Sequence, residues 1–205
     1  WIASQYGGAA LLGSAARPGA VLEALGNFDV IHFSCHGHFR RRSPMHSALA
    51  LAEGELTAAD ILHAVEARGT RMRADIVTLS ACDTGLNHVA PSDELLGLTR
   101  AFLGCGTRSL VVTLWPVHEV PTRLFMEHFY QTWRKGASKT EALAAAQQYL
   151  TAVDFAALET RLRDYALSAA SIAETVRLFR TMLPGEQPFA HPFYWAAFLL
   201  IGDPR

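Results

Sequence analysis

The stretch ADIVTLS, at residues 74–80, decides the fold of this chain. It is strongly apolar, as expected for a strand of a parallel sheet that is covered on both faces. Two stretches of similar character, DVIHFS at 29–34 and SLVVTLW at 109–115, predict two further strands. Helical patterns separate these strands, and strands that alternate with long helices form right-handed crossover units. The sequence therefore predicts an α/β fold, a three-layer α/β/α sandwich around a mostly parallel central sheet.

Capping residues mark the limits of several helices. Thr57 precedes a helix predicted over 58–68, which Gly69 ends, and Ser138 precedes a helix predicted over 139–153. The remaining elements are predicted from their apolar patterns: helices over 18–25, 92–103, 121–135 and, less regularly, 154–182, and short strands over 9–12, 48–52 and 193–201.

The composition is that of an ordinary globular domain. The 205 residues are half hydrophobic and carry a formal net charge of −1, so no basic excess predicts direct binding of nucleic acid. The longest apolar run, 193–201, is too short to predict a membrane span. Three cysteines, an odd number, do not indicate a disulfide framework and fit a reducing compartment. Because the first residue is Trp1 and not Met, we expect the sequence to be a piece of a longer chain.

Two motifs that carry reactive side chains follow predicted strands. HFSCHGH, at 32–38, contains His36, and LSACDTG, at 79–85, contains Cys82. In open α/β sheets, ligands bind beyond the carboxyl ends of the strands, so both side chains are expected in one crevice. Each motif also contains a glycine, Gly37 in the first and Gly85 in the second. These glycines let the backbone turn sharply beside a ligand.

A cysteine beside a histidine is the arrangement of a thiol nucleophile and its base. A free thiol has a pKa of about 8.5, and a neighbouring imidazole accepts its proton and later protonates the leaving amine. The backbone N–H groups of Gly37 and Cys82 are the expected donors to the oxyanion. Taken alone, Cys82 could instead be a small buried apolar residue, as most free cysteines are.

The first motif is also dense in metal-ligand types. His32, Cys35, His36 and His38 lie within seven positions, yet successive residues of a strand point to opposite faces and do not converge on one ion. We therefore expect no metal. Cys35 is expected in the core and His38 at the rim of the site, while His32 is either a core histidine or a residue that orients His36.

Six segments together resemble the CHAT family, the caspase-related cysteine peptidases of clan CD that are often fused to tetratricopeptide repeats. The segments are DVIHFSCHGHF (29–39), IVTLSACDTGL (76–86), DELLGLTRAFLGCGTRSLVVTLWPV (93–117), FMEHFYQTW (125–133), EALAAAQQYL (141–150) and HPFYWAAFLLIGD (191–203). The spacing of 46 residues from His36 to Cys82 is similar to the caspase pattern.

The resemblance implies a caspase-like fold and cleavage of a protein or peptide substrate by a dyad of His36 and Cys82, without a required third acid. It implies no cofactor, and a cytoplasmic enzyme that is switched on by a sensor or repeat domain in the same chain or in a partner subunit. A role in bacterial antiviral defence or programmed cell death is the accompanying expectation. The loops at 38–47 and 86–92 are candidate switch elements, or else ordinary surface loops.

The substrate pocket is where the sequence departs from the family. His118 and Glu119 stand where acidic residues usually follow the Leu-Trp-Pro strand. We expect Asp83, Trp115 and Glu119 to bind substrate, with the two carboxylates favouring a basic P1 residue. Asp83 could instead cap a turn or helix, and Trp115 could be a core residue at its strand end.

We expect a single domain over 1–205, with a helical insertion at 153–188, and without the family's usual first strand. A non-catalytic interaction module on the same fold is the alternative function, because a fold does not by itself specify catalysis. A thiol transferase or redox sensor is disfavoured, because the chain contains no Cys-x-x-Cys motif.

Overall fold

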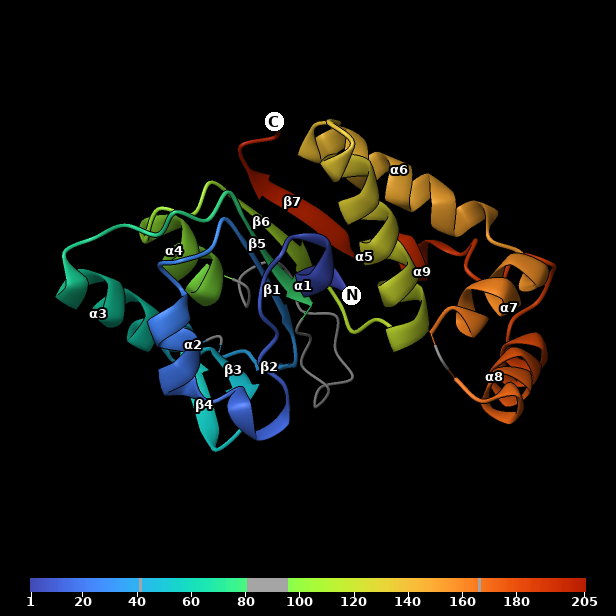
Figure 1. The fold of residues 1–205 in the computed structure, drawn as a ribbon, viewed down its shortest axis with the longest axis horizontal. Helices are drawn as coiled ribbons and strands as arrows, with labels where there is room; N and C mark the ends of the chain where they lie inside the picture. The colour runs from blue at the N-terminus through green and yellow to red at the C-terminus, as the bar shows by residue number, and fades with distance from the viewer. Residues whose placement is uncertain (41, 81–95, 166) are drawn as a thin grey trace. The chain divides into compact units, whose positions relative to one another are not determined.

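The computed structural model describes residues 1–40, 42–80, 96–165 and 167–205 (Figure 1). The chain divides into two compact units. The first consists of Trp1–Val117 together with Ala197–Arg205, and the second consists of His118–Ala196. The chain therefore leaves the first unit, builds the second and returns to the first for its last nine residues.

The first unit contains the central sheet, whose strand order is β1-β5-β6-β7. Its first three strands are parallel, and β7 runs antiparallel to β6 at one edge. A smaller antiparallel sheet has the order β2-β3-β4. The strands are β1 (Val30–Ser34), β2 (His36–His38), β3 (Ala48–Leu51), β4 (Gly54–Thr57), β5 (Ile76–Ser80), β6 (Ser109–Thr113) and β7 (Phe198–Gly202).

The helices of the first unit are short except for α3 and α4. They are α1 (Ile2–Gln5), η1 (Gly13–Ala15), α2 (Pro18–Ala24), η2 (Pro44–His46), α3 (Ala58–Arg68) and α4 (Leu96–Gly104), where η marks a 3₁₀ helix. The expected α/β class, with a mostly parallel central sheet flanked by helices, is confirmed.

Alternate residues of the central strands build the core of the first unit. The rings of Phe33 on β1 and Phe102 on α4 lie 5.8 Å apart, which joins the sheet to the helix layer. Burial of such a side chain contributes about 2 kcal/mol. The buried residues of this cluster on β1, β5, β6, α3 and α4 include Phe33, Val77, Leu79, Leu110, Val112, Ile61, Leu98, Ala101 and Phe102.

The helix with the clearest sequence signal has the predicted bounds. Thr57 accepts a hydrogen bond from the N–H of Asp60, and the Asp60 carboxylate accepts one from the N–H of Thr57, which forms a capping box. Gly69 ends the helix in the left-handed conformation, with φ of +63°. Ser138 forms a second capping box with Glu141.

Two strand predictions are wrong. Residues 9–12 form no strand, and Leu12 is 75% exposed, so these apolar residues have no sheet to pack against. In the run 193–201, the first three residues belong to the helix α9 (Pro192–Trp195), and β7 begins only at Phe198. His191 caps that helix through Nδ1, and proline at its first position fixes a helical φ, so this local start signal overrides the apolar pattern.

The second unit is helical. It contains α5 (Glu119–Arg134), α6 (Lys139–Ala152), α7 (Phe155–Arg163), α8 (Ala169–Met182) and α9. The helical character predicted for 154–182 is confirmed, whereas the assignment of 153–188 as an insertion in a single domain stays a prediction. The helix predicted over 92–103 is confirmed from Leu96 onward, and residues 92–95 lie outside the described residues.

A buried carboxylate joins three segments of the second unit. Glu127 on α5 is 4% exposed and accepts hydrogen bonds from Arg161 Nη2 at 2.6 Å, Tyr165 Oη at 2.9 Å and Arg123 Nε at 3.1 Å. Burial, followed by the hydrogen bond to Glu127, raises the pKa of Tyr165, so its hydroxyl remains a donor. This network connects α5 to the last turn of α7 and to Tyr165, two residues beyond the end of that helix.

His32 lies on β1, opposite Thr78 of β5 in the parallel register. Its neighbours Ile31 and Phe33 point into the core cluster, so its imidazole lies on the other face of the sheet. Burial lowers the pKa of His32 to about 4, and the imidazole is therefore neutral at pH 7. The His32 side chain is half-buried by its fractional exposure, and both of its predicted roles, core histidine or residue that orients His36, stay predictions.

We expect Glu127→Gln to lower the free energy of unfolding by about 3 kcal/mol, because it leaves Arg123 and Arg161 without their shared anion. The matched control is Glu159→Gln, which removes an exposed ion pair with Arg163 and should cost less than about 1 kcal/mol. Urea denaturation of both variants measures the difference. An equal decrease in the free energy of unfolding in both variants would show that the buried ion pairs of Glu127 stabilise the fold no more than an exposed ion pair does.

We expect the folded protein to lose stability as the pH falls from 6.5 towards 4, because the unfolded chain protonates His32 while the folded chain does not. One such proton contributes a slope of up to about 1.4 kcal/mol per pH unit. Urea denaturation across this range should show a shallower pH dependence for His32→Gln. The exposed-histidine control His63→Gln should keep the wild-type slope, and an unchanged slope in His32→Gln would contradict the assignment.

Candidate functional site

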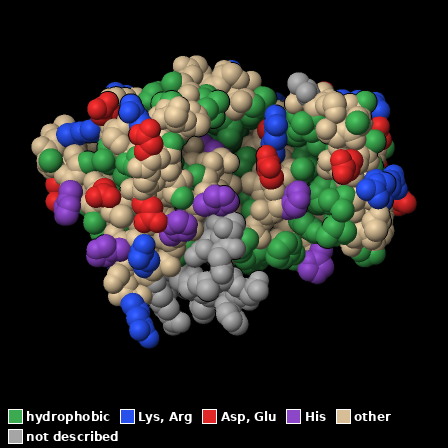
Figure 2. Space-filling view, turned by 90° about the horizontal axis from the view of Figure 1, so that it is seen from below, with side chains coloured by type: hydrophobic (Ala, Val, Ile, Leu, Met, Phe, Trp, Pro, Cys, Tyr) green, Lys and Arg blue, Asp and Glu red, His purple; other side chains and the backbone are tan. Residues whose placement is uncertain are grey.

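His36 lies on a different sheet from the strand that precedes it. β1 ends at Ser34, and after Cys35 the chain enters β2, where His36 pairs with Ala50 of β3. The imidazole is exposed. Figure 2 shows several histidine side chains exposed on the side of the molecule that is lowest in Figure 1, where β2, β3 and β4 lie. His36 is therefore held by an antiparallel hairpin beside the carboxyl end of β1.

The second motif follows the neighbouring strand. β1 and β5 pair in parallel with Ser34 opposite Ser80, so both strands end at the same level of the sheet. Adjacent strands lie about 4.8 Å apart. Cys82 and Asp83, together with the loop at 86–92, lie outside the described residues. In the sequence, His36 follows Ser34 by two positions, and Cys82 follows Ser80 by two positions.

Gly37, the expected oxyanion donor, is buried between His36 and His38 on β2 and pairs with Leu49. Because side chains alternate along a strand, His36 and His38 share the opposite face of this sheet. The structure thus brings an exposed imidazole and the backbone of Gly37 together at adjacent positions of β2.

An acid that the sequence analysis missed lies on the same sheet. His38 Nδ1 is 2.6 Å from Glu55 Oε1, and Arg40 Nη2 is 3.6 Å from Glu55 Oε2. Ala50 of β3 pairs with His36 on one side and with Glu55 on the other, so the three residues form a row across the sheet. His38 is exposed, and its expected place at the rim of the site stays a prediction. Only the hairpin register identifies Glu55, because nothing in its local sequence marks it.

The two described cysteines are poor nucleophiles. Cys35 is half-buried and packs against the core, and burial raises the pKa of its thiol to about 11. Cys105 is buried, and burial followed by the charge of Glu66 raises the pKa of its thiol. Both thiols are therefore protonated at pH 7, and the expectation that Cys35 belongs to the core is confirmed.

Of the predicted substrate-binding residues, Trp115 and Glu119 are described, and they belong to different units. Trp115 is half-buried and follows β6, the third parallel strand of the first unit. Glu119 is exposed and begins α5 in the second unit, where His118 caps the helix by accepting a hydrogen bond from Val120 N–H at 3.3 Å. An acid in the first turn also interacts favourably with the helix dipole, which gives Glu119 a structural role of its own.

The loop predicted as a switch element at 38–47 is largely described. It contains η2, and Ser47 at its end is fully buried. The Ser47 hydroxyl accepts a hydrogen bond from Arg40 N–H at 3.0 Å, and its carbonyl accepts one from Ala58 N–H at 2.9 Å. These contacts tie the loop to the start of α3.

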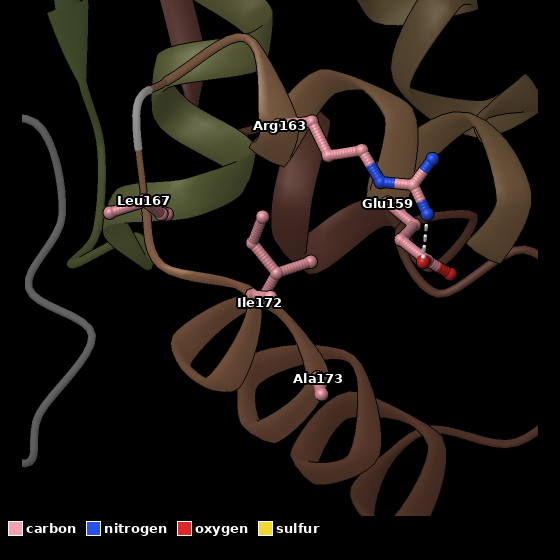
Figure 3. Close-up of a pocket in the computed structure, with 6 residues that line it drawn as sticks. Glu159, Arg163, Leu167, Ile172 and Ala173 are labelled. Atoms are coloured by element: carbon pink, nitrogen blue, oxygen red, sulfur yellow. Dashed lines mark hydrogen bonds and ion pairs between the residues drawn. The ribbon is translucent and has the colours of Figure 1, made fainter.

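A pocket of about 270 Å³ lies in the second unit, and its lining residues are not those of the expected site (Figure 3). Ile172 and Ala173 of α8 form part of it, and the ion pair between Arg163 and Glu159 lines its edge. None of the residues predicted to act on a substrate lines this pocket.

Two findings on the described part of the chain concern metal ions and membranes. Its histidine, cysteine and carboxylate side chains form no group of three that could hold a metal ion. Among the helices of these same residues, none is both long and apolar enough to cross a membrane.

Comparison with known proteins gives a family for this arrangement. The chain is 28% identical over 153 residues to tetratricopeptide repeat protein 28 of Mus musculus and 26% identical to that of Homo sapiens. Each alignment covers 75% of this chain and 5% of the relative, so the chain corresponds to a small part of those proteins. A model of the CHAT domain matches residues 1–203, nearly the whole chain. The chain therefore belongs to the CHAT domain family.

Proposed function

We propose that this chain is a cysteine endopeptidase domain in which Cys82 attacks the substrate and His36 is its base. The parallel register of Ser34 with Ser80 carries the proposal. Two residues span at most about 7 Å, so each reactive residue is tethered close to one of two adjacent strand ends. Family membership supports the caspase-like fold, and the sequence supplies both members of the dyad.

The exposed imidazole of His36 suits it to act as a general base and acid. It takes the proton of the Cys82 thiol, and the thiolate forms a bond to the carbonyl carbon of the substrate. The carbonyl oxygen becomes an oxyanion, for which the N–H groups of Gly37 and Cys82 are the proposed donors. The imidazolium then protonates the leaving amine as the C–N bond breaks. Water hydrolyses the resulting thioester and regenerates the thiol.

The environments of the other thiols favour Cys82 by elimination. Burial keeps Cys35 and Cys105 protonated, and neither shares the exposed face of His36 on β2. Selective reactivity at a single cysteine is therefore expected, and it is the property that separates a peptidase from an interaction module.

Substrate choice and control are further parts of the proposal. Asp83 and Glu119 supply negative charge for a basic P1 side chain, and Trp115, which follows a central strand, forms an apolar wall. Because the aligned relatives are named for tetratricopeptide repeats, we propose that a fused or partner repeat domain switches the enzyme on in the cytoplasm. A role in antiviral defence or programmed cell death accompanies this proposal.

We expect a peptide acyloxymethyl ketone to label the full-length protein once, at Cys82. Intact-protein mass spectrometry should show no label in Cys82→Ala. In His36→Ala the labelling rate should fall by a factor of about 100, because no base then takes the proton of the Cys82 thiol. The control Cys35→Ala should retain labelling. Absence of labelling in the full-length protein together with its activating partner would reject the peptidase and favour the non-catalytic interaction module.

We expect P1 arginine substrates to be cleaved faster than P1 leucine substrates, with the preference reduced about tenfold in Asp83→Asn and Glu119→Gln, the loss that 1.4 kcal/mol of binding represents. The ratio of kcat/KM values for matched peptides measures the preference. Glu174→Gln, which removes an exposed carboxylate of α8, is the control. A preference that both site variants preserve would remove these carboxylates from the pocket.

A further inference from the structure

Gly97, the second residue of α4, lies unusually close to another segment of the backbone. A Cβ atom at this position would lie 1.8 Å from the carbonyl oxygen of Pro44, 2.6 Å from its carbonyl carbon and 3.2 Å from its Cα. These are backbone atoms, so no change of side-chain rotamer relieves the clash. Only glycine allows α4 and η2 to approach this closely.

Gly104, at the end of the same helix, provides the contrast. The nearest atom to a Cβ built there is Leu62 Cδ2, at 3.7 Å, which is ordinary contact with a flexible side chain. Alanine is the better helix former at a position without close neighbours, so it should be tolerated at Gly104. At Gly97 the contact with Pro44 reverses that expectation.

The segment against which Gly97 packs is a fixed turn. The carbonyl of Pro44 accepts a hydrogen bond from Ser47 N–H at 3.0 Å, and the carbonyl of Ser43 accepts one from His46 N–H at 2.8 Å. Ser47 is fully buried and accepts from Arg40 N–H. A displacement of Pro44 therefore moves a hydrogen-bonded unit and not a single residue.

This turn connects the two strands that hold His36. It joins β2 to β3, in which His38 pairs with Ala48 and His36 with Ala50. Only one residue, Ser47, separates η2 from β3. The position of Pro44 is thus transmitted through the buried Ser47 to β3, which pairs with β2, the strand that carries the imidazole.

We propose that Gly97 is a positioning residue: its contact with Pro44 fixes the turn at 43–47 and, through the β2–β3 hairpin, the place of His36. This inference rests on the proposed function, because it assigns to His36 the role of base. A side chain at position 97 would push the turn away from α4 and shift the hairpin, while leaving the chemistry of the imidazole itself unaltered.

The first measurement is hydrogen exchange by mass spectrometry on the full-length protein, and it does not depend on catalysis. We expect peptides covering 36–51 to exchange about tenfold faster or more in Gly97→Ala than in the wild type, because the turn opens more often. Peptides from α7 and α8 should keep their wild-type rates in this variant. Gly104→Ala should match the wild type throughout.

The second measurement is the rate at which a peptide electrophile modifies Cys82. We expect Gly97→Ala to reduce the maximal labelling rate about 100-fold with little change in the concentration for half-maximal rate, as for a misplaced base. Ser47→Ala should change both readouts in the same direction, and the double variant should show non-additive losses because both residues act through one turn.

Ser109→Ala is the matched control for a buried serine. Ser109 is fully buried and donates a hydrogen bond to the carbonyl of Asp203 at 2.7 Å, at the start of β6. Loss of this hydrogen bond in Ser109→Ala should leave the hydrogen exchange of peptides covering 36–51 and the labelling rate of Cys82 unchanged.

Wild-type exchange at 36–51 and wild-type labelling in Gly97→Ala would overturn the inference. If Gly97→Ala does not fold, Ser47→Ala decides, and behaviour equal to that of Ser109→Ala overturns it. A wild-type protein that resists labelling even when activated rejects the proposed peptidase, whereas faster exchange in Gly97→Ala would still show that the contact fixes the hairpin.

Discussion

The parallel pairing of β1 with β5 is the constraint on which the rest of the first unit depends. It places Phe33 and Leu79 on the core face and His32 and Thr78 on the other. A slip of one residue would exchange these faces and place His32 or Thr78 where Phe33 and Leu79 now pack against the helices. The same register makes both strands end level, so the two motifs leave the sheet side by side. Core packing and the arrangement of the candidate site therefore have one physical origin.

The elements that were predictable from sequence are those with local causes. The helix 58–68 carries its own start and stop signals in Thr57 and Gly69, and the apolar stretch 74–80 needs no partner to be recognised as a strand. The run at 193–201 misled because apolar character alone does not distinguish a strand from a short capped helix. The alternation of apolar strand patterns with helical patterns predicted the class of the fold, and capping contacts then decided the bounds of the elements.

The parts of the site that escaped prediction depend on contacts between distant residues. Glu55 is an ordinary exposed acid in the sequence and becomes a neighbour of His38 only through the pairing of three strands. Gly97 reads as a helical glycine until the carbonyl of Pro44 is placed beside it. His36 was predicted as a strand-end residue, but it belongs to a hairpin with its own hydrogen bonds. The central sheet and His36 are thus held by different sets of contacts.

The discontinuity of the first unit has a consequence for biosynthesis. β7, which covers one edge of the sheet, comes from residues that follow the entire second unit in the chain. As the ribosome releases the polypeptide, β6 is available before its antiparallel neighbour exists, and the helices of the second unit are synthesised in the interval. An uncovered strand presents unpaired backbone groups that attract other chains. The nascent chain thus passes through a stage in which chaperones have an open edge to protect, and this stage ends when the last strand emerges.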